Sequence, residues 1–224
     1  MSKEKSKKAA ALKALDWVEG GMVIGLGSGS TSHHFIHGLV EKFKQGLNVQ
    51  AIASSKESEA LAKAGGIPLL DQSQVATLDL TIDGADEIDS QKRLIKGAGG
   101  ALVREKILAS MSHEMIVIAD ESKLVDTLGR APLPIEIIPF GVEATIRHLE
   151  TLSLKGALRG KNAPYLTDNG NYIYDAIFSA PVENPEGLHL SLVQIPGVVD
   201  TGFFFQLAGR VVIGREDGTV MVKD

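Results

Sequence analysis

The sequence predicts an α/β protein in which a Rossmann-like, largely parallel sheet carries helices on both faces and precedes a smaller ferredoxin-like α+β domain. Over residues 1–120, short apolar runs alternate with helical patterns, which is the order found in parallel sheets. A cluster of prolines, Pro132, Pro134 and Pro139, then marks a change of organisation. Beyond it the expected order is β-α-β-β-α-β, the ferredoxin-like pattern.

The elements of the first domain follow from the spacing of apolar residues. Leu12, Leu15 and Val18 recur at helical spacing, and the pair Gly20-Gly21 ends that helix. Apolar runs such as MVIGL and LDLTI indicate buried strands. The helices expected are 4–19, 31–44, 55–65 and 100–111, and the strands expected are 22–26, 48–54, 67–70, 78–82 and 114–120.

The second domain is delimited by the same kinds of signal. Asn169-Gly170 predicts a turn just before the strand NYIYDAIF, and Asp217-Gly218 predicts a C-terminal hairpin. The strands expected are 135–139, 154–159, 171–178 and 201–206, and the helices expected are 142–152 and 186–195. We therefore expect a catalytic α/β domain at 1–130, a small α+β domain at 131–206 and a hairpin at 207–224 that returns to the catalytic domain.

Composition and charge narrow the classes of function. The 224 residues carry a net charge of −5, which argues against nucleic-acid binding because that relies on clustered cations. There is no cysteine, so no disulfide, thiol nucleophile or zinc–thiolate site is expected. The N-terminus lacks a signal-peptide core, and no apolar run approaches the roughly 20 residues that span a bilayer. We expect a soluble, cytoplasmic protein that binds neither membranes nor nucleic acid.

The segment GLGSGST, residues 25–31, lies between an expected strand and an expected helix. A glycine-rich loop there presents backbone N–H groups and a helix N-terminus, so a phosphate is the natural ligand. The dinucleotide fingerprint is not met, because Ser30 stands in place of its third glycine. The alternative is a tight turn capped by Ser or Thr.

On the next helix, His33 and His37 have a spacing that suits a metal, but a packed or solvated helix face is the preferred interpretation.

Four carboxylates stand within the seven residues of DGADEID, 83–89, directly after the strand LDLTI. A metal cage, a set of acid/base catalysts and a merely acidic turn are all compatible with such a cluster. Its spacing does not follow the calcium-loop pattern D-x-[DN]-x-[DN]-G. Asp83 and Asp86, at the carboxyl end of the strand, can both reach a ligand, whereas Glu87 and Asp89 are expected to cap, pair or face water.

The segment KGAGGALVREK, residues 96–106, joins a glycine-rich loop to a helix. Its glycines allow the backbone to close tightly on a ligand. On the helix, Glu105 falls in the middle of an arc of apolar side chains, where a carboxylate is unexpected. Burial would make this carboxylate a stronger base when ionised. The alternative is that Glu105 pairs with an Arg or Lys from elsewhere in the chain.

Taken together, GLGSGST, DGADEID, KGAGGALVREK and the later ADESK resemble ribose-5-phosphate isomerase of the A type. The proline-rich junction, the segments TDNGN and IPGVV and the C-terminal hairpin extend the resemblance over essentially the whole chain. It implies that D-ribose 5-phosphate and D-ribulose 5-phosphate are interconverted through an enediolate, in the non-oxidative branch of the pentose phosphate pathway. It also implies no metal and no cofactor, a phosphosugar as the small-molecule partner, and a homodimer or homotetramer.

The resemblance assigns roles to individual residues as well. The general base is Glu105, and Asp83, Asp86 and Lys96 match the other catalytic positions. The substrate contacts carry over to Ser28, Gly29, Ser30, Thr31, Gly84, Ala85, Gly97, Ala98, Gly99 and Lys123, with Lys7 as an additional phosphate cation. In this assignment Lys96 and the amides of its loop face the enediolate oxygen, and one of the two aspartates moves the oxygen proton and assists ring opening.

Two other functions are compatible with parts of the sequence. An NADP-dependent oxidoreductase would use the glycine loop together with Ser54, Ser55 and Lys56, but the broken fingerprint counts against it. A non-catalytic sugar-phosphate sensor would share the fold, but the N-terminal helix is too short to be a helix-turn-helix. The presence of both Lys96 and Glu105 also favours catalysis.

Overall fold

The computed structural model describes residues 2–224, which form two compact units. Unit 1 comprises residues 2–85, 104–123 and 206–224, and unit 2 comprises residues 86–103 and 124–205. The chain therefore leaves unit 1 twice, first between Ala85 and Asp86 and again after Lys123. This grouping differs from the contiguous division at residues 130 and 206, because the segment 86–103 packs with the second unit although it lies early in the chain.

Unit 1 is built on a six-stranded sheet. Its strands are β1 (Val23–Leu26), β2 (Gln50–Ala53), β3 (Leu78–Gly84), β6 (Ser112–Asp120), β12 (Ala208–Gly214) and β13 (Val220–Lys223). They are arranged in the order β13-β12-β6-β3-β1-β2, and every neighbouring pair is parallel except the hairpin β12-β13. The C-terminal hairpin thus joins the main sheet beside β6, as the sequence predicted.

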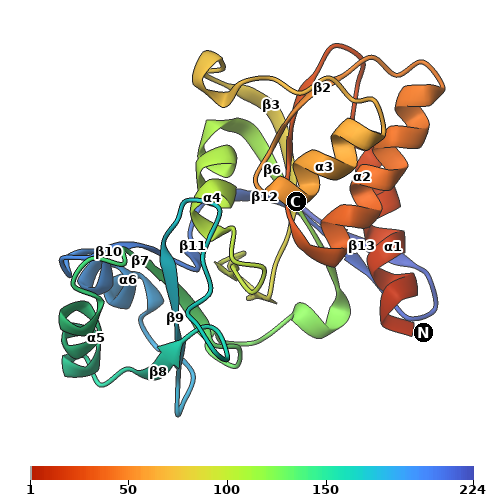
Figure 1. The fold of residues 1–224 in the computed structure, drawn as a ribbon. Helices are drawn as coiled ribbons and strands as arrows, with labels where there is room; N and C mark the ends of the chain where they lie inside the picture. The colour runs from red at the N-terminus through yellow and green to blue at the C-terminus, as the bar shows by residue number, and fades with distance from the viewer. Residues whose placement is uncertain (1) are drawn as a thin grey trace. The chain divides into compact units, whose positions relative to one another are not determined.

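The helices of this sheet lie on both of its faces (Figure 1). They are α1 (Ser2–Ala14), α2 (Gly29–Lys44), α3 (Lys56–Ala64) and α4 (Leu102–Met111), with short 3-10 turns at Leu15–Trp17, Gln72–Gln74 and Glu121–Lys123. On one face, Ile24 and Ile82 of the sheet share a core with Phe35 of α2. On the other, the Thr81 hydroxyl donates to the carbonyl of Leu108 in α4, at 3.4 Å. The Rossmann-like arrangement is therefore confirmed.

Unit 2 contains a four-stranded antiparallel sheet and a small three-stranded sheet. The larger sheet consists of β7 (Leu133–Ile137), β8 (Lys155–Leu158), β9 (Tyr172–Ile177) and β10 (Val198–Thr201), with helices α5 (Val142–Thr151) and α6 (Pro185–Val193). Its order β10-β7-β9-β8 is the ferredoxin-like topology expected from the sequence. The smaller sheet consists of β4 (Glu87–Ile88), β5 (Leu94–Ile95) and β11 (Phe203–Phe204).

Two strand predictions need correction. The run 67–70 forms no regular strand, and only an isolated bridge joins Leu69 to Ala51. The strand expected at 201–206 is divided, because β10 ends at Thr201 and β11 begins at Phe203 in the other sheet. Between them, the Gly202 N–H donates to the Pro134 carbonyl and its carbonyl accepts from the N–H of Lys96. The chain thus changes sheets at this glycine.

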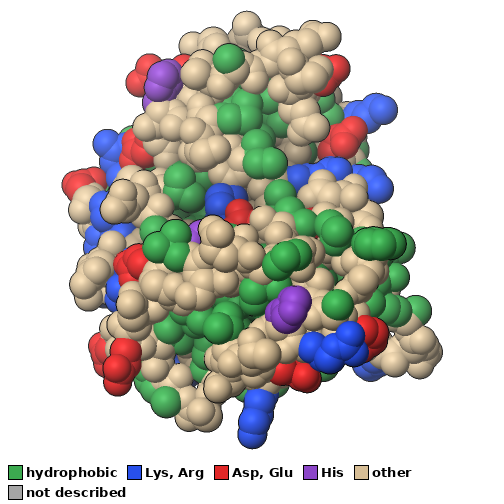
Figure 2. All heavy atoms as spheres, turned by 90° about the vertical axis from the view of Figure 1, so that its left-hand side faces the viewer, with side chains coloured by type: hydrophobic (Ala, Val, Ile, Leu, Met, Phe, Trp, Pro, Cys, Tyr) green, Lys and Arg blue, Asp and Glu red, His purple; other side chains and the backbone are tan. Residues whose placement is uncertain are grey.

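The surface mixes charges of both signs. On the face drawn in Figure 2, lysine and arginine side chains lie among acidic and apolar ones, in line with the net charge of −5. Within residues 2–224, no helix is long and apolar enough to cross a membrane.

Candidate active site

Three neighbouring parallel strands of unit 1 end at one edge of the sheet, and the predicted substrate-binding residues of this unit follow them. The loop 27–31 follows β1, Ala85 follows β3, and the 3-10 turn ending at Lys123 follows β6. Ligands of parallel α/β sheets bind beyond the carboxyl ends of the strands. The order of the strands therefore brings these segments to the edge at which a ligand is expected.

Asp83, the second-last residue of β3, binds the loop that follows β1. Its side chain is fully buried, and its Oδ1 accepts hydrogen bonds from the Gly84 N–H at 2.7 Å, the Ser28 N–H at 3.1 Å and the Ser32 hydroxyl at 3.3 Å. A side chain at Gly27 would overlap with this carboxylate. Glycine at position 27 therefore allows the loop 27–31 to lie close to the end of β3.

Glu105 is buried in the first turn of α4, as the apolar arc in the sequence predicted. Its Oε1 accepts a short hydrogen bond from the hydroxyl of Ser28. Ser28 is the N-cap of α2, yet its hydroxyl does not cap that helix. The loop expected to hold a phosphate and the carboxylate expected to act as a base are thus in direct contact.

A cation reaches the same loop from α1. The ammonium of Lys7 donates to the Ser30 hydroxyl at 3.0 Å and to Glu4 Oε1 at 2.8 Å, and Glu4 also contacts His34 at 2.9 Å. The hydrogen bond from Lys7, followed by that from His34, lowers the pKa of Glu4 from 4.5 to about 2. Glu4 therefore stays ionised throughout the neutral range and holds Lys7 beside the loop, where Thr31 also lies in the first turn of α2.

The remaining predicted catalytic residues belong to unit 2. The Asp86 N–H donates to the Ile95 carbonyl at 2.8 Å, which continues the antiparallel pairing of β4 with β5 and brings Asp86 opposite Lys96. Lys96 is buried, and its ammonium lies 5.3 Å from the centre of the Phe204 ring. Asp86 Oδ2 accepts the N–H of Ala98 at 2.9 Å. Asp86, Lys96 and the loop 96–100 therefore form one cluster.

Arg159, which contacts this loop, and Asp175, which holds Arg159, were not predicted from the sequence. Arg159 donates to the carbonyls of Gly97 and Ala98, at 3.0 Å each, and is held by Asp175 on β9. The only sequence signal for them is a carboxylate within the apolar strand NYIYDAIF and an arginine at the end of the expected strand LKGALR. Neither pattern indicates that Arg159 reaches a loop about 60 residues away in the sequence.

The last two carboxylates of DGADEID are structural. Glu87 is buried and accepts the N–H groups of Gly129 and Ala131. Asp89 is buried and accepts the N–H of Arg93 at 2.9 Å and its Nε at 2.6 Å. The prediction that they cap or pair is confirmed, although neither of them faces water.

The three histidines of α2 do not converge on one site. His33 lies 3.7 Å from Glu57, His34 contacts Glu4, and His37 is exposed. Throughout residues 2–224, no group of three or more His, Asp or Glu side chains has an arrangement that could hold a metal ion.

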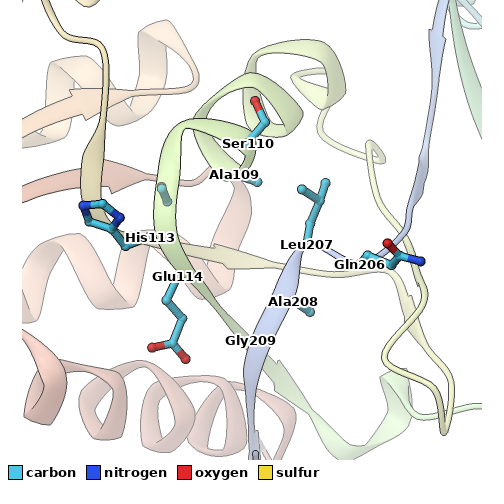
Figure 3. Close-up of a pocket in the computed structure, with 9 residues that line it drawn as sticks. Ala109, Ser110, His113, Glu114, Gln206, Leu207, Ala208 and Gly209 are labelled. Carbon is cyan, nitrogen blue, oxygen red and sulfur yellow. The ribbon is translucent and has the colours of Figure 1, made fainter.

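A separate pocket of about 380 Å³ lies at the opposite edge of the sheet (Figure 3). It is lined by the end of α4, the start of β6 at Ser112 and His113, and the start of β12 at Ala208. Because the strands are parallel, their amino ends lie away from the carboxyl ends at which Asp83 is found. None of the predicted site residues lines this pocket.

Comparison with known proteins identifies the family. The family model for ribose 5-phosphate isomerase A (phosphoriboisomerase A) matches residues 50–218. This chain belongs to the ribose 5-phosphate isomerase A family. It is 49% identical over 220 residues to ribose-5-phosphate isomerase A of Protochlamydia amoebophila, covering 97% of this chain and 95% of that protein. It is 45% identical to the protein of the same name from Parvibaculum lavamentivorans, with complete coverage of both chains.

A solved structure gives the same result. A D-ribose-5-phosphate isomerase in complex with phospho-erythronic acid matches with a TM-score of 0.94 and 41% identity, over 100% of both chains. The family and the fold class predicted from the sequence are thus confirmed, as is the enzyme class, an aldose–ketose isomerase. The oxidoreductase and the sugar-phosphate sensor are not favoured.

The close approach at Gly27 yields a testable prediction. Gly27→Ala adds a methyl group that overlaps with the Asp83 carboxylate, so the loop or the carboxylate must shift. Because displacements of about 1 Å cost on the order of 10²-fold in rate, we expect kcat/KM for ribose 5-phosphate to fall at least tenfold. Gly20→Ala is the control, since a methyl there meets nothing closer than 3.9 Å. Equal kcat/KM in the two variants would contradict the importance of this approach.

Proposed function

We propose that this protein interconverts D-ribose 5-phosphate and D-ribulose 5-phosphate by proton transfer through an enediolate, with Glu105 as the base. The observation that carries the proposal is the contact between the buried Glu105 and Ser28 of the loop 28–31. A base that moves a proton between C1 and C2 must reach both carbons while the phosphate of the same substrate is held. Glu105 is placed on a helix, which supplies the rigidity that such a transfer requires.

The negative charge that develops on the substrate oxygen needs donors that are already oriented. Lys96 and the N–H groups of Ala98 and Gly99 are assigned this role, since preorganised donors stabilise an enediolate more than they stabilise the sugar. Asp86 is assigned the proton that moves between the two oxygens, because it is only partly buried and contacts the N–H of Ala98. Asp83 is fully buried and accepts several hydrogen bonds, so we assign to it the positioning of the loop 27–31 and the binding of a substrate hydroxyl.

The phosphate is assigned to the N-terminus of α2. Gly29, Ser30 and Thr31 lie in its first turn, where backbone N–H groups and the helix dipole favour an anion. Lys7 and Lys123 add positive charge. The phosphate does not react, and its binding energy serves to orient the sugar.

The assignment of Glu105 predicts the result of an isosteric substitution. Glu105→Gln removes the base but keeps the shape, so kcat should fall by about 10³-fold or more, while phosphosugar binding persists. Turnover is measured in a coupled assay of ribose 5-phosphate isomerisation with EDTA present, and binding by calorimetry with phospho-erythronic acid, the ligand of the solved relative.

Glu114→Gln is the control for this experiment, because Glu114 is a partly buried carboxylate that pairs with Arg210 at the opposite edge of the sheet. A near-normal kcat in Glu105→Gln would remove Glu105 from the mechanism. Loss of activity of the wild-type protein in EDTA would instead contradict the metal-free reaction.

The assignment of Lys7 predicts a different kinetic signature. Lys7→Ala removes a cation held beside the phosphate loop, so KM for ribose 5-phosphate should rise about tenfold with a smaller change in kcat, and the difference should shrink in high salt. Lys8→Ala, an exposed lysine on the same helix, is the control. A pure kcat effect in Lys7→Ala, or equal KM values in both variants, would contradict the phosphate role.

The oligomeric state and location complete the proposal. Membership of the family supports a homodimer or homotetramer, and a cytoplasmic enzyme, as expected from the sequence. Light scattering coupled to size-exclusion chromatography should give a mass of two or four times 23.8 kDa. A monomer that is fully active would contradict this part of the proposal.

A further inference from the structure

The loop 96–100 is held by side chains from a distant part of unit 2. The Nη1 group of Arg159 donates to two successive carbonyls, those of Gly97 and Ala98, at 3.0 Å each. The rest of the guanidinium is fixed by Asp175, which accepts Nε at 2.8 Å and Nη2 at 2.6 Å. The guanidinium is thus oriented by a bidentate ion pair, which directs its Nη1 group at the loop.

These two carbonyls belong to the peptide groups whose N–H donors matter for the reaction. In a trans peptide the C=O and N–H point in opposite directions, so fixing the carbonyls of Gly97 and Ala98 directs the N–H groups of Ala98 and Gly99 away from Arg159. The structure supports this for the first of them, because the Ala98 N–H donates to Asp86 at 2.9 Å. A cation on the carbonyl side also polarises both peptides and strengthens their N–H donors.

Further contacts limit the loop to this conformation. Gly97 has φ of +107°, which other residues rarely adopt, and its carbonyl also accepts the Gly100 N–H at 2.9 Å. Tyr165 donates to the Gly99 carbonyl at 3.4 Å and lies 5.8 Å from the Arg159 guanidinium. A side chain at Gly100 would overlap with the Tyr165 ring.

We propose that Arg159, fixed by Asp175, is a positioning residue that sets the amides of Ala98 and Gly99 for the substrate oxygen and for Asp86. The proposal rests on the function assigned above to this loop. Arg159 does not touch the substrate in this role. It acts through the two peptide groups, so its loss lowers the rate of the chemical step more than the affinity for the phosphosugar.

The test compares three variants with the wild-type protein in the coupled isomerase assay. Arg159→Ala should lower kcat by about 10- to 100-fold with a much smaller change in KM, and added guanidinium ion should restore part of kcat. Asp175→Asn should show a weaker effect of the same kind, because the arginine remains but loses its bidentate partner. Arg210→Ala is the matched control, since Arg210 makes a comparable pair with Glu114 in unit 1.

Failure of the proposed isomerase function and failure of the positioning role of Arg159 give different results. If wild-type protein does not turn over ribose 5-phosphate, the proposed function itself fails. If wild-type and Arg210→Ala are active and Arg159→Ala equals them in kcat, only the positioning role is overturned. The role would also be overturned, in favour of a purely structural ion pair, if guanidinium did not restore kcat and if Arg159→Ala and Asp175→Asn showed equal losses of kcat and of thermal stability. If Arg159→Ala does not fold, Arg159→Lys decides. An ammonium has three donors and no planar fork, so it cannot replace the four hydrogen bonds of Arg159, and kcat equal to wild type would refute the role.

Discussion

The hydrogen bonds that Asp83 accepts are the interaction on which the site of unit 1 depends. They join the end of β3 to the loop after β1 through the Ser28 N–H, and to α2 through the Ser32 hydroxyl. Once the loop is fixed in this way, the hydroxyl of Ser28 reaches Glu105. Removing the carboxylate would leave the partly buried N–H donors of Ser28 and Gly84 without their acceptor, and the cost for each is at most the roughly 1–3 kcal/mol of a fully buried donor. The conformation of the loop is thus coupled to the residue assigned as the base.

The acidic segment DGADEID uses the same chemistry four times. Each of its carboxylates accepts at least one backbone N–H, and together they fix four different segments of the chain. The donors are Ser28 and Gly84 for Asp83, Ala98 for Asp86, Gly129 and Ala131 for Glu87, and Gln91 and Arg93 for Asp89. Carboxylates suit this purpose because each oxygen accepts more than one hydrogen bond and charge strengthens it. A cluster that suggests a metal cage in the sequence is therefore a set of loop anchors, of which Asp83 and Asp86 also carry assigned roles in the reaction.

The sequence predicts well what depends on local pattern and poorly what depends on distant partners. Burial of Glu105 follows from its place among apolar residues on one helix, and the ferredoxin-like order follows from the spacing of strands and turns. The two-residue strands β4, β5 and β11 are too short to show any periodicity, and they exist only through their mutual pairing. The change of sheet at Gly202 and the pairing of Arg159 with the loop 96–100 could not be predicted for a similar reason. Each is fixed by contacts that span about 60 residues or more of sequence.

Two serines at equivalent junctions show how the site overrides local stability. Ser28 and Ser55 both follow parallel strands and both stand at the N-cap of the next helix with extended backbone. Ser55 accepts the N–H of Ser58 at 3.1 Å, as an N-cap normally does, whereas the hydroxyl of Ser28 donates to Glu105. A capping hydrogen bond stabilises a helix by roughly 1 kcal/mol, so α2 forgoes that contribution. The N–H groups at its start are then left for a ligand, as an anion-binding helix requires, whereas in α3 the side chain of Ser55 accepts one of them. Both serines fit the same capping pattern in the sequence, and only the position of Glu105 distinguishes them.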